Sequence, residues 1–100
     1  MATLHLLSDS PFASDRFASC LPLLGDGDGL LLCGDAVYAL RGATAQRRQL
    51  EQLAPGIALH ALAEDVEARA LGDLPERVVL LDYPGFVELC CRFERVNSWL

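Results

Sequence analysis

The sequence predicts an α/β fold, a small Rossmann-like three-layer domain with a four- to five-stranded, mainly parallel sheet. Four short apolar segments indicate the strands, and each one ends at an aspartate: residues 4–9, 30–35, 57–65 and 78–82. Strands of a parallel sheet are buried on both faces, so they read as continuous apolar runs. The order βαβαβαβα then implies right-handed crossovers and helices on both faces of the sheet.

The first connecting segment predicts a helix that begins at Ser10 and Pro11. Serine is a favoured N-cap, and a proline at the first helical position loses no hydrogen bond. Pro22 is expected to kink or end this helix, because it has no N–H to donate to the carbonyl four residues back. Four side chains at helical spacing form its apolar stripe: Phe17, Cys20, Leu21 and Leu24.

The middle of the chain alternates turns and short helices. A glycine-aspartate turn over residues 25–29 leads into the second strand. Asp35 is expected to cap a short segment over residues 36–41, and Asp9 to cap the first helix in the same way. Thr44 predicts the start of a polar surface helix that stops before Pro55 and Gly56.

Two further helices are predicted in the second half, one over residues 64–71 and one opened by Pro84 and Gly85. The last helix presents one apolar face, formed by Phe86, Leu89, Cys90 and Phe93. The tail over residues 96–100 is the exception to this compact pattern. Its Trp99 must either fold back onto the domain or dock elsewhere.

The composition indicates a single domain over residues 1–100 that binds a partner. Apolar residues make up 52% of the chain, which is more than one sheet and its helices need to bury. Aromatic side chains are enriched in protein interfaces. The candidate interface residues are Trp99, Phe12, Tyr83 and Phe86.

Charge and patterning exclude several classes of function. The net charge of −6, carried with eight arginines and no lysine, argues against direct binding of nucleic acid and removes P-loop and Schiff-base chemistry. The apolar runs are too short to cross a membrane, and the start of the chain lacks a secretory signal, so a cytoplasmic location is expected. No cofactor is expected, and the cysteine spacings lack the C-x-x-C pair of a zinc or redox site.

Four cysteines are the candidate reactive groups. Cys20 is read either as a nucleophile or sulfur carrier, with Arg16 as the one nearby cation in sequence, or as a small buried side chain. Cys33 at the end of a strand resembles a redox or phosphocysteine turn, but core packing is the simpler interpretation. Cys90 and Cys91 diverge by about 100° on a helix, so one is expected in the core and one near the surface.

The histidines and aspartates give weaker signals. His5 and His60 lie in strand runs without a neighbouring nucleophile, which favours structural roles. The aspartates at the strand ends are arranged as in phospho-acceptor domains, but such domains also use a lysine, and this chain has none.

Taken together, the short motifs resemble the TusB/DsrH family across essentially the whole chain. Each motif is weak alone, but their order and spacing are specific. They are Leu4-His5, Ser10-Pro11-Phe12, Ser19-Cys20-Leu21, Leu30-Leu31-Leu32, Asp35-Ala36-Val37-Tyr38-Ala39, Ala61-Leu62, Glu64-Asp65, Ala68-Arg69, Asp82-Tyr83, Gly85-Phe86-Val87 and Trp99.

The resemblance implies a subunit of a cytoplasmic sulfur relay, assembled with two sibling chains similar to TusC and TusD as a heterohexamer. In the tRNA branch of the family, the complex passes persulfide sulfur to a downstream carrier similar to TusE, for 2-thiolation of wobble uridine, and the main sulfur-accepting cysteine belongs to a sibling.

Two alternatives stay open. In the DsrH branch, which serves dissimilatory sulfur oxidation with a DsrC-like carrier, a cysteine in the Ser-Cys-Leu setting contacts that carrier, and Cys20 matches it. A standalone domain that binds a small ligand at the Cys33-Gly34-Asp35 turn is the unrelated alternative.

Overall fold

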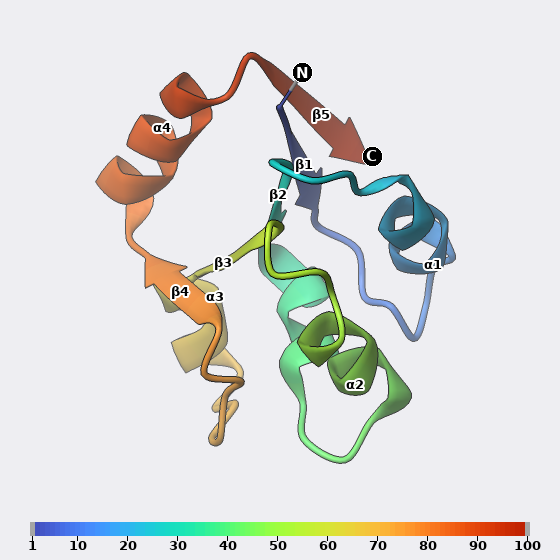
Figure 1. The fold of residues 1–100 in the computed structure, drawn as a ribbon. Helices are drawn as coiled ribbons and strands as arrows, with labels where there is room; N and C mark the ends of the chain where they lie inside the picture. The colour runs from blue at the N-terminus through green and yellow to red at the C-terminus, as the bar shows by residue number, and fades with distance from the viewer. Residues whose placement is uncertain (1, 100) are drawn as a thin grey trace.

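The computed structural model describes residues 2–99 and contains one five-stranded sheet in which every neighbouring pair of strands is parallel. The strand order is β4-β3-β2-β1-β5, as Figure 1 shows. The strands are β1 (Thr3–Leu7), β2 (Gly29–Leu32), β3 (Ala58–Leu62), β4 (Val78–Leu81) and β5 (Arg95–Trp99). The predicted fold class is therefore confirmed, with the fifth strand coming from the tail.

Helical segments join consecutive strands. They are α1 (Arg16–Cys20), the 3-10 turns η1 (Leu21–Leu23) and η2 (Gly34–Leu40), α2 (Ala45–Glu51), α3 (Ala63–Ala68) and α4 (Tyr83–Arg92). The chain moves from β1 to β4 in one direction and then returns across the sheet to β5. Because right-handed crossovers in opposite directions lie on opposite faces, α4 lies on one side of the sheet, with α1 and α2 on the other (Figure 1).

Each face of the sheet has its own hydrophobic core. The larger core joins inward side chains of the sheet to α1, η2, α2 and α3; it includes Leu7, Phe17, Cys20, Leu30, Leu32, Val37, Leu40, Leu50, Leu59 and Val66. The smaller core lies under α4 and contains Leu4, Leu31 and Leu89, with Leu6, Leu81, Phe86, Cys90 and Phe93 packed around them. The predicted apolar face of the last helix is thus confirmed.

The tail folds back as β5, with Trp99 alongside Leu7 of β1. The indole Nε1 of Trp99 donates to Nδ1 of His5 at 3.1 Å. The other ring nitrogen of His5 lies 3.8 Å from the Asp28 carboxylate. Burial opposes ionisation of Asp28, but amide hydrogen bonds from Gly25 and Thr3 hold its pKa below the ordinary value. Strands β1 and β5 are therefore linked through one buried network of polar side chains.

The predicted start of the first helix at Ser10 is wrong. The carbonyl of Ser10 accepts hydrogen bonds from the amides of Ala13 and Ser14, and its Oγ accepts from Phe12, which closes a single turn. That turn is not continued, and α1 begins at Arg16. The serine and proline have the chemistry of a helix start, but local hydrogen bonding of this kind serves an isolated turn equally well.

Of the four capping residues predicted, one was predicted correctly. Thr44 caps α2 by accepting from the amide of Arg47 at 3.2 Å, which confirms the prediction. Asp35 makes no capping hydrogen bond to η2, and Asp9 pairs with Arg16 instead. Both aspartates were expected to be caps, but each pairs with an arginine instead.

The helix predicted over residues 64–71 is α3 and ends three residues earlier, at Ala68. Its end is a Schellman motif, in which the amide of Leu71 donates to the carbonyl of Val66 and the amide of Ala70 to that of Glu67. Ala70 takes a φ of +50°, a position that usually belongs to glycine.

No helix in the described part of the chain is long and apolar enough to span a membrane.

Candidate functional site

The carboxyl ends of β1, β2 and β3 bring polar side chains together, as expected for an open parallel sheet. Asp9 follows β1, Asp35 follows β2, and Asp65 lies in the first turn of α3 directly after β3. Asp82 follows β4 but is used locally, since it accepts from the amide of Gly85 and caps α4. Three of the four predicted strand-end aspartates therefore occupy one region of the molecule.

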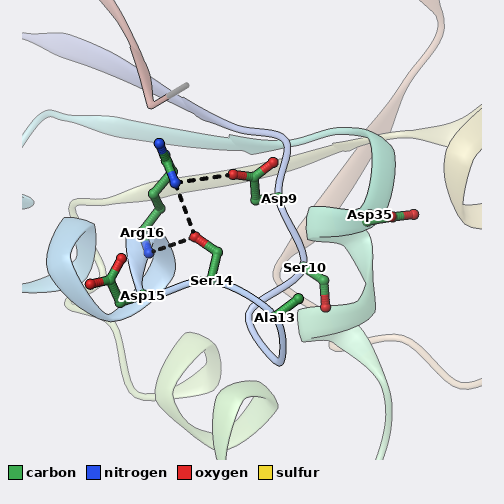
Figure 2. A pocket seen from close by; sticks show the side chains of 7 residues that line it. All are labelled: Asp9, Ser10, Ala13, Ser14, Asp15, Arg16 and Asp35. Carbon is green, nitrogen blue, oxygen red and sulfur yellow. Dashed lines mark hydrogen bonds and ion pairs between the residues drawn. The ribbon is translucent and has the colours of Figure 1, made fainter.

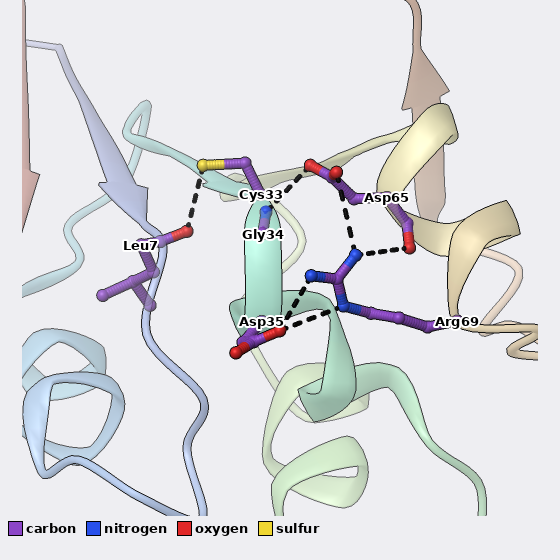
Figure 3. Close-up of polar contacts among 6 residues, drawn as sticks. All are labelled: Leu7, Cys33, Gly34, Asp35, Asp65 and Arg69. Atoms are coloured by element: carbon purple, nitrogen blue, oxygen red, sulfur yellow. Dashed lines mark hydrogen bonds and ion pairs between the residues drawn. The ribbon is translucent and has the colours of Figure 1, made fainter.

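Arg69 joins two of these carboxylates (Figure 3). Its Nη2 lies 2.7 Å from Asp35 Oδ1, and its Nη1 lies 3.7 Å from Asp65 Oδ1. The other carboxylate oxygen of Asp65 accepts from the amide of Gly34 at 2.8 Å. The hydrogen bonds that Arg69 donates to Asp35, assisted by the charges of both carboxylates, raise the pKa of Arg69. The cluster is a closed ion-pair network that clamps the turn after β2 to α3.

Cys33 lies at the edge of this network. Its Sγ is placed to donate to the carbonyl of Leu7 at 3.5 Å, and the side chain is half-buried. Burial, together with the negative charge of Asp65, raises the pKa of the thiol. The amide of Gly34 already donates to Asp65, so this amide is not free to bind a phosphoryl group. The surroundings favour the protonated, unreactive form of Cys33.

An open groove of about 610 Å³ lies beside the cluster (Figure 2). Its lining residues are Asp9, Ser10, Ala13, Ser14, Asp15, Arg16 and Asp35. Arg16 lies 3.4 Å from Asp9 and also contacts the hydroxyl of Ser14. Arg16, the one cation close to Cys20 in sequence, thus directs its guanidinium to the groove. The arrangement is polar and solvated, without a thiol among its lining residues.

Cys20, the candidate relay thiol, lies in the larger core and is fully buried. It is the last residue of α1, followed by the 3-10 turn that contains Pro22, as the expected helix break requires. Burial raises the pKa of the thiol from 9.0 to about 11. Since the thiolate is the nucleophile, this environment strongly disfavours attack on a persulfide.

The four candidate interface residues differ in their surroundings. Phe12 in the loop before α1 and Tyr83 at the start of α4 are 54% and 50% exposed. Phe86 packs against the smaller core, and Trp99 against the larger one. The chain itself therefore partly buries two of the four aromatic side chains.

The remaining candidates, Cys90, Cys91 and His60, lie outside the cluster and the groove described above. Cys90 is half-buried and Cys91 exposed, which confirms the predicted division of the pair. Nδ1 of His60 is buried without a hydrogen-bond partner among the described residues. Burial, aided by the positive charge of Arg92, lowers the pKa of His60. Within residues 2–99, no group of three or more ligating side chains is placed to hold a metal ion.

Comparison with known proteins identifies the family. The family model described as DsrH like protein matches residues 9–96. This chain belongs to the TusB/DsrH family. Protein TusB of Escherichia coli K12 is 42% identical over 99 residues, covering 96% of this chain and 99% of the relative. Protein TusB of Shigella boydii is 41% identical over the same length. The resemblance inferred from the short motifs is confirmed.

Solved structures confirm the fold independently of sequence. The ychN protein from E. coli has a TM-score of 0.78 at 19% identity, over 99% of this TusB/DsrH-family chain and 100% of its own. A protein of unknown function from Methanobacterium thermoautotrophicum has a TM-score of 0.68 at 15% identity, over 96% of both chains. At these identities the likeness establishes a shared fold and no more.

Sequence reasoning missed the role of Arg69. The Ala68-Arg69 pair was noticed as a family-like motif, but the two carboxylates that Arg69 joins are four and 34 residues away. The i,i+4 spacing to Asp65 is a signal that a helix surface provides. The contact with Asp35 depends on the parallel packing of β2 and β3 and has no local signature.

Proposed function

We propose that this chain is an assembly subunit of a cytoplasmic sulfur relay, which passes persulfide sulfur towards 2-thiolation of the wobble uridine of tRNA. In this proposal the chain binds two sibling chains, similar to TusC and TusD, in a heterohexamer, and contributes to the docking of a downstream carrier similar to TusE. The identity to TusB over nearly the whole chain supports the tRNA branch. The net charge of −6 is consistent with a subunit that does not bind tRNA directly.

The observation that carries the assembly role is the contrast between buried thiols and exposed apolar side chains. Cys20 is sealed in the core with a raised pKa, and Cys33 is half-buried beside a carboxylate. Phe12 and Tyr83 are each at least half exposed. Exposed apolar groups of this size favour protein contacts, whereas thiol exchange needs an accessible thiolate.

The assembly role is tested by co-expression of the chain with its two siblings. A tag on one sibling is used for purification, and light scattering measures the size of the complex. The expected result is co-purification in equal amounts and a mass of two copies of each chain. A Phe12→Ser/Tyr83→Ser variant should co-purify poorly while keeping its own fold by circular dichroism. Full recovery of the variant would contradict the roles of these two side chains.

A relay role for Cys20 is the alternative that the same complex can decide. The complex is incubated with a cysteine desulfurase, its sulfur carrier and cysteine. The intact mass of each chain is then measured by mass spectrometry. We expect the sulfur atom on a sibling chain and normal thiolated tRNA in cells that carry Cys20→Ala. A gain of one sulfur atom on this chain that Cys20→Ala abolishes would instead make Cys20 a relay thiol. It would also require α1 to open in the complex, because a buried thiol cannot exchange.

A further inference from the structure

Helix α4 carries apolar side chains on two sides. Its inner side packs on the smaller core, as described above. A second stripe, Tyr83, Val87 and Cys91, repeats every four residues along the outer surface. Tyr83 is 50% exposed and Val87 61% exposed, and Cys91 is exposed as well. A helix covered by solvent on its outer side normally shows polar residues there, so this stripe is unpartnered.

A charged pair runs beside the stripe. Glu88 and Arg92 form an ion pair at 3.1 Å, and both side chains are largely exposed. The pair has no net charge, although the whole chain carries −6. Two copies of an acidic protein repel each other least when they meet through such a neutral surface.

The outer apolar stripe and the charged pair are each complementary to themselves when α4 packs against a second α4 in the antiparallel direction. Both repeat at four residues, so Val87 lies opposite Cys91 of the copy while Glu88 lies opposite Arg92 of the copy. The two-fold axes that these pairings need fall level with Leu89 and with Cys90, about 1.5 Å apart along the helix. One dimer therefore satisfies the apolar and the charged pairing together.

We propose that the outer face of α4, formed by Val87, Glu88, Cys91 and Arg92, binds the same face of a second copy of this chain in an antiparallel, isologous contact. A helix pair of this length is small for an interface, so the contact is weak in the isolated chain and adds to others in a larger complex. The inference goes beyond the proposed function because it concerns the copy of this chain and no sibling.

Cross-linking tests the register. With the two-fold axis midway between the levels of Leu89 and Cys90, the two Cys91 residues lie about 4.5 Å apart along the helix axis. Diamide takes two electrons and two protons from the two thiols, which form a disulfide while its azo group becomes a hydrazine. We expect a covalent dimer that Cys91→Ser abolishes and Cys90→Ser retains. Absence of the dimer, or its persistence in Cys91→Ser, would overturn the proposal.

Sedimentation equilibrium of reduced protein tests the surface, at concentrations up to about 100 μM to cover weak interfaces. Val87→Glu should raise the dimer Kd about tenfold or more. Leu23→Glu is the matched control, because Leu23 is also 61% exposed but lies in η1. We expect Leu23→Glu to dimerise like the unaltered chain. A monomeric unaltered chain, or equal Kd values for the two variants, would overturn the proposal.

Charge exchange tests the flanking pair. Glu88→Arg places two arginines opposite each other and should weaken the dimer, whereas Glu88→Arg combined with Arg92→Glu recreates the complementarity and should restore it. A double variant as weak as the single one would contradict the antiparallel register. These assays use the chain alone, so their failure leaves the sibling assembly untouched. If the chain alone is monomeric and Val87→Glu instead abolishes co-purification with the siblings, this face binds a sibling and the proposal is wrong.

Discussion

Replacement of Arg77 by methionine should destabilise the fold more than any other exchange of a partly exposed arginine. Arg77 lies just before β4, and its guanidinium reaches back over the connection between α2 and β3. It donates to five backbone carbonyls, those of Leu50, Glu51, Leu53, Ala54 and Ile57. Several of these carbonyls lie at and just after the end of α2, where a cation is also favoured by the helix dipole.

The expected loss of stability comes from the partly buried hydrogen bonds of Arg77, because water does not readily replace them. Nη2 of Arg77 donates to Ile57 at 2.9 Å, and Nη1 donates to Leu53, both in partly buried surroundings. The bond to Ala54 is exposed, and the bonds to Leu50 and Glu51 are long. Two charge-assisted hydrogen bonds at about 1.5 kcal/mol each give a loss of about 3 kcal/mol. For a domain of this size, that loss lowers Tm by about 15 °C.

Urea and thermal unfolding monitored by circular dichroism measure the effect. Arg48→Met is the control, because Arg48 is an exposed arginine of α2 that makes no side-chain hydrogen bond or ion pair within residues 2–99. We expect the control to change stability by less than about 0.5 kcal/mol. A loss below about 1 kcal/mol in Arg77→Met would refute the reasoning, since the carbonyls would then be equally well solvated by water.

Three further predictions concern stability. Ala70→Gly should stabilise the protein by about 0.5–1 kcal/mol in urea unfolding, because alanine is strained at a φ of +50°, whereas Ala68→Gly within α3 should destabilise it by a similar amount; the same sign for both would contradict the strain argument. Trp99→Phe should cost about 1–2 kcal/mol, since Nδ1 of the buried His5 loses its donor, and no change in Tm would exclude that role. Burial raises the pKa of the Cys20 thiol from 9.0 to about 11, so the unfolded chain loses this proton first and stability should fall as pH rises from 9 to 11. Cys20→Ala should reduce that slope, and identical slopes would show that Cys20 does not titrate there.

Several elements were predictable because their signals are local. Strand β4 over Val78–Leu81 and the apolar face of α4 were read from uninterrupted and periodic apolar residues. Thr44 caps α2 as predicted, because a threonine side chain just before a helix reaches an amide of the first turn. The start of the first helix failed for the same local reason, since Ser10 and Pro11 satisfy a single turn as well as a helix.

The candidate site was only partly predictable. The gathering of Asp9, Asp35 and Asp65 follows from the rule that parallel strands end at one edge. The pairing of Arg16 with Asp9 depends on how the loop between them folds, and that of Arg69 with Asp35 depends on the packing of segments that are 34 residues apart. A stripe of apolar residues includes positions at its centre and at its border, so spacing alone did not decide how deeply Cys20 is buried.

The apolar runs, the turn residues and the family motifs were sufficient to establish a parallel α/β sheet and membership of the TusB/DsrH family. Tertiary structure alone decided that the tail becomes β5, that Cys20 is sealed in the core, and that α4 keeps an apolar outer stripe. The physical reason is that local patterns report which residues avoid water, whereas the neighbours that remove the water come from segments far apart in the chain.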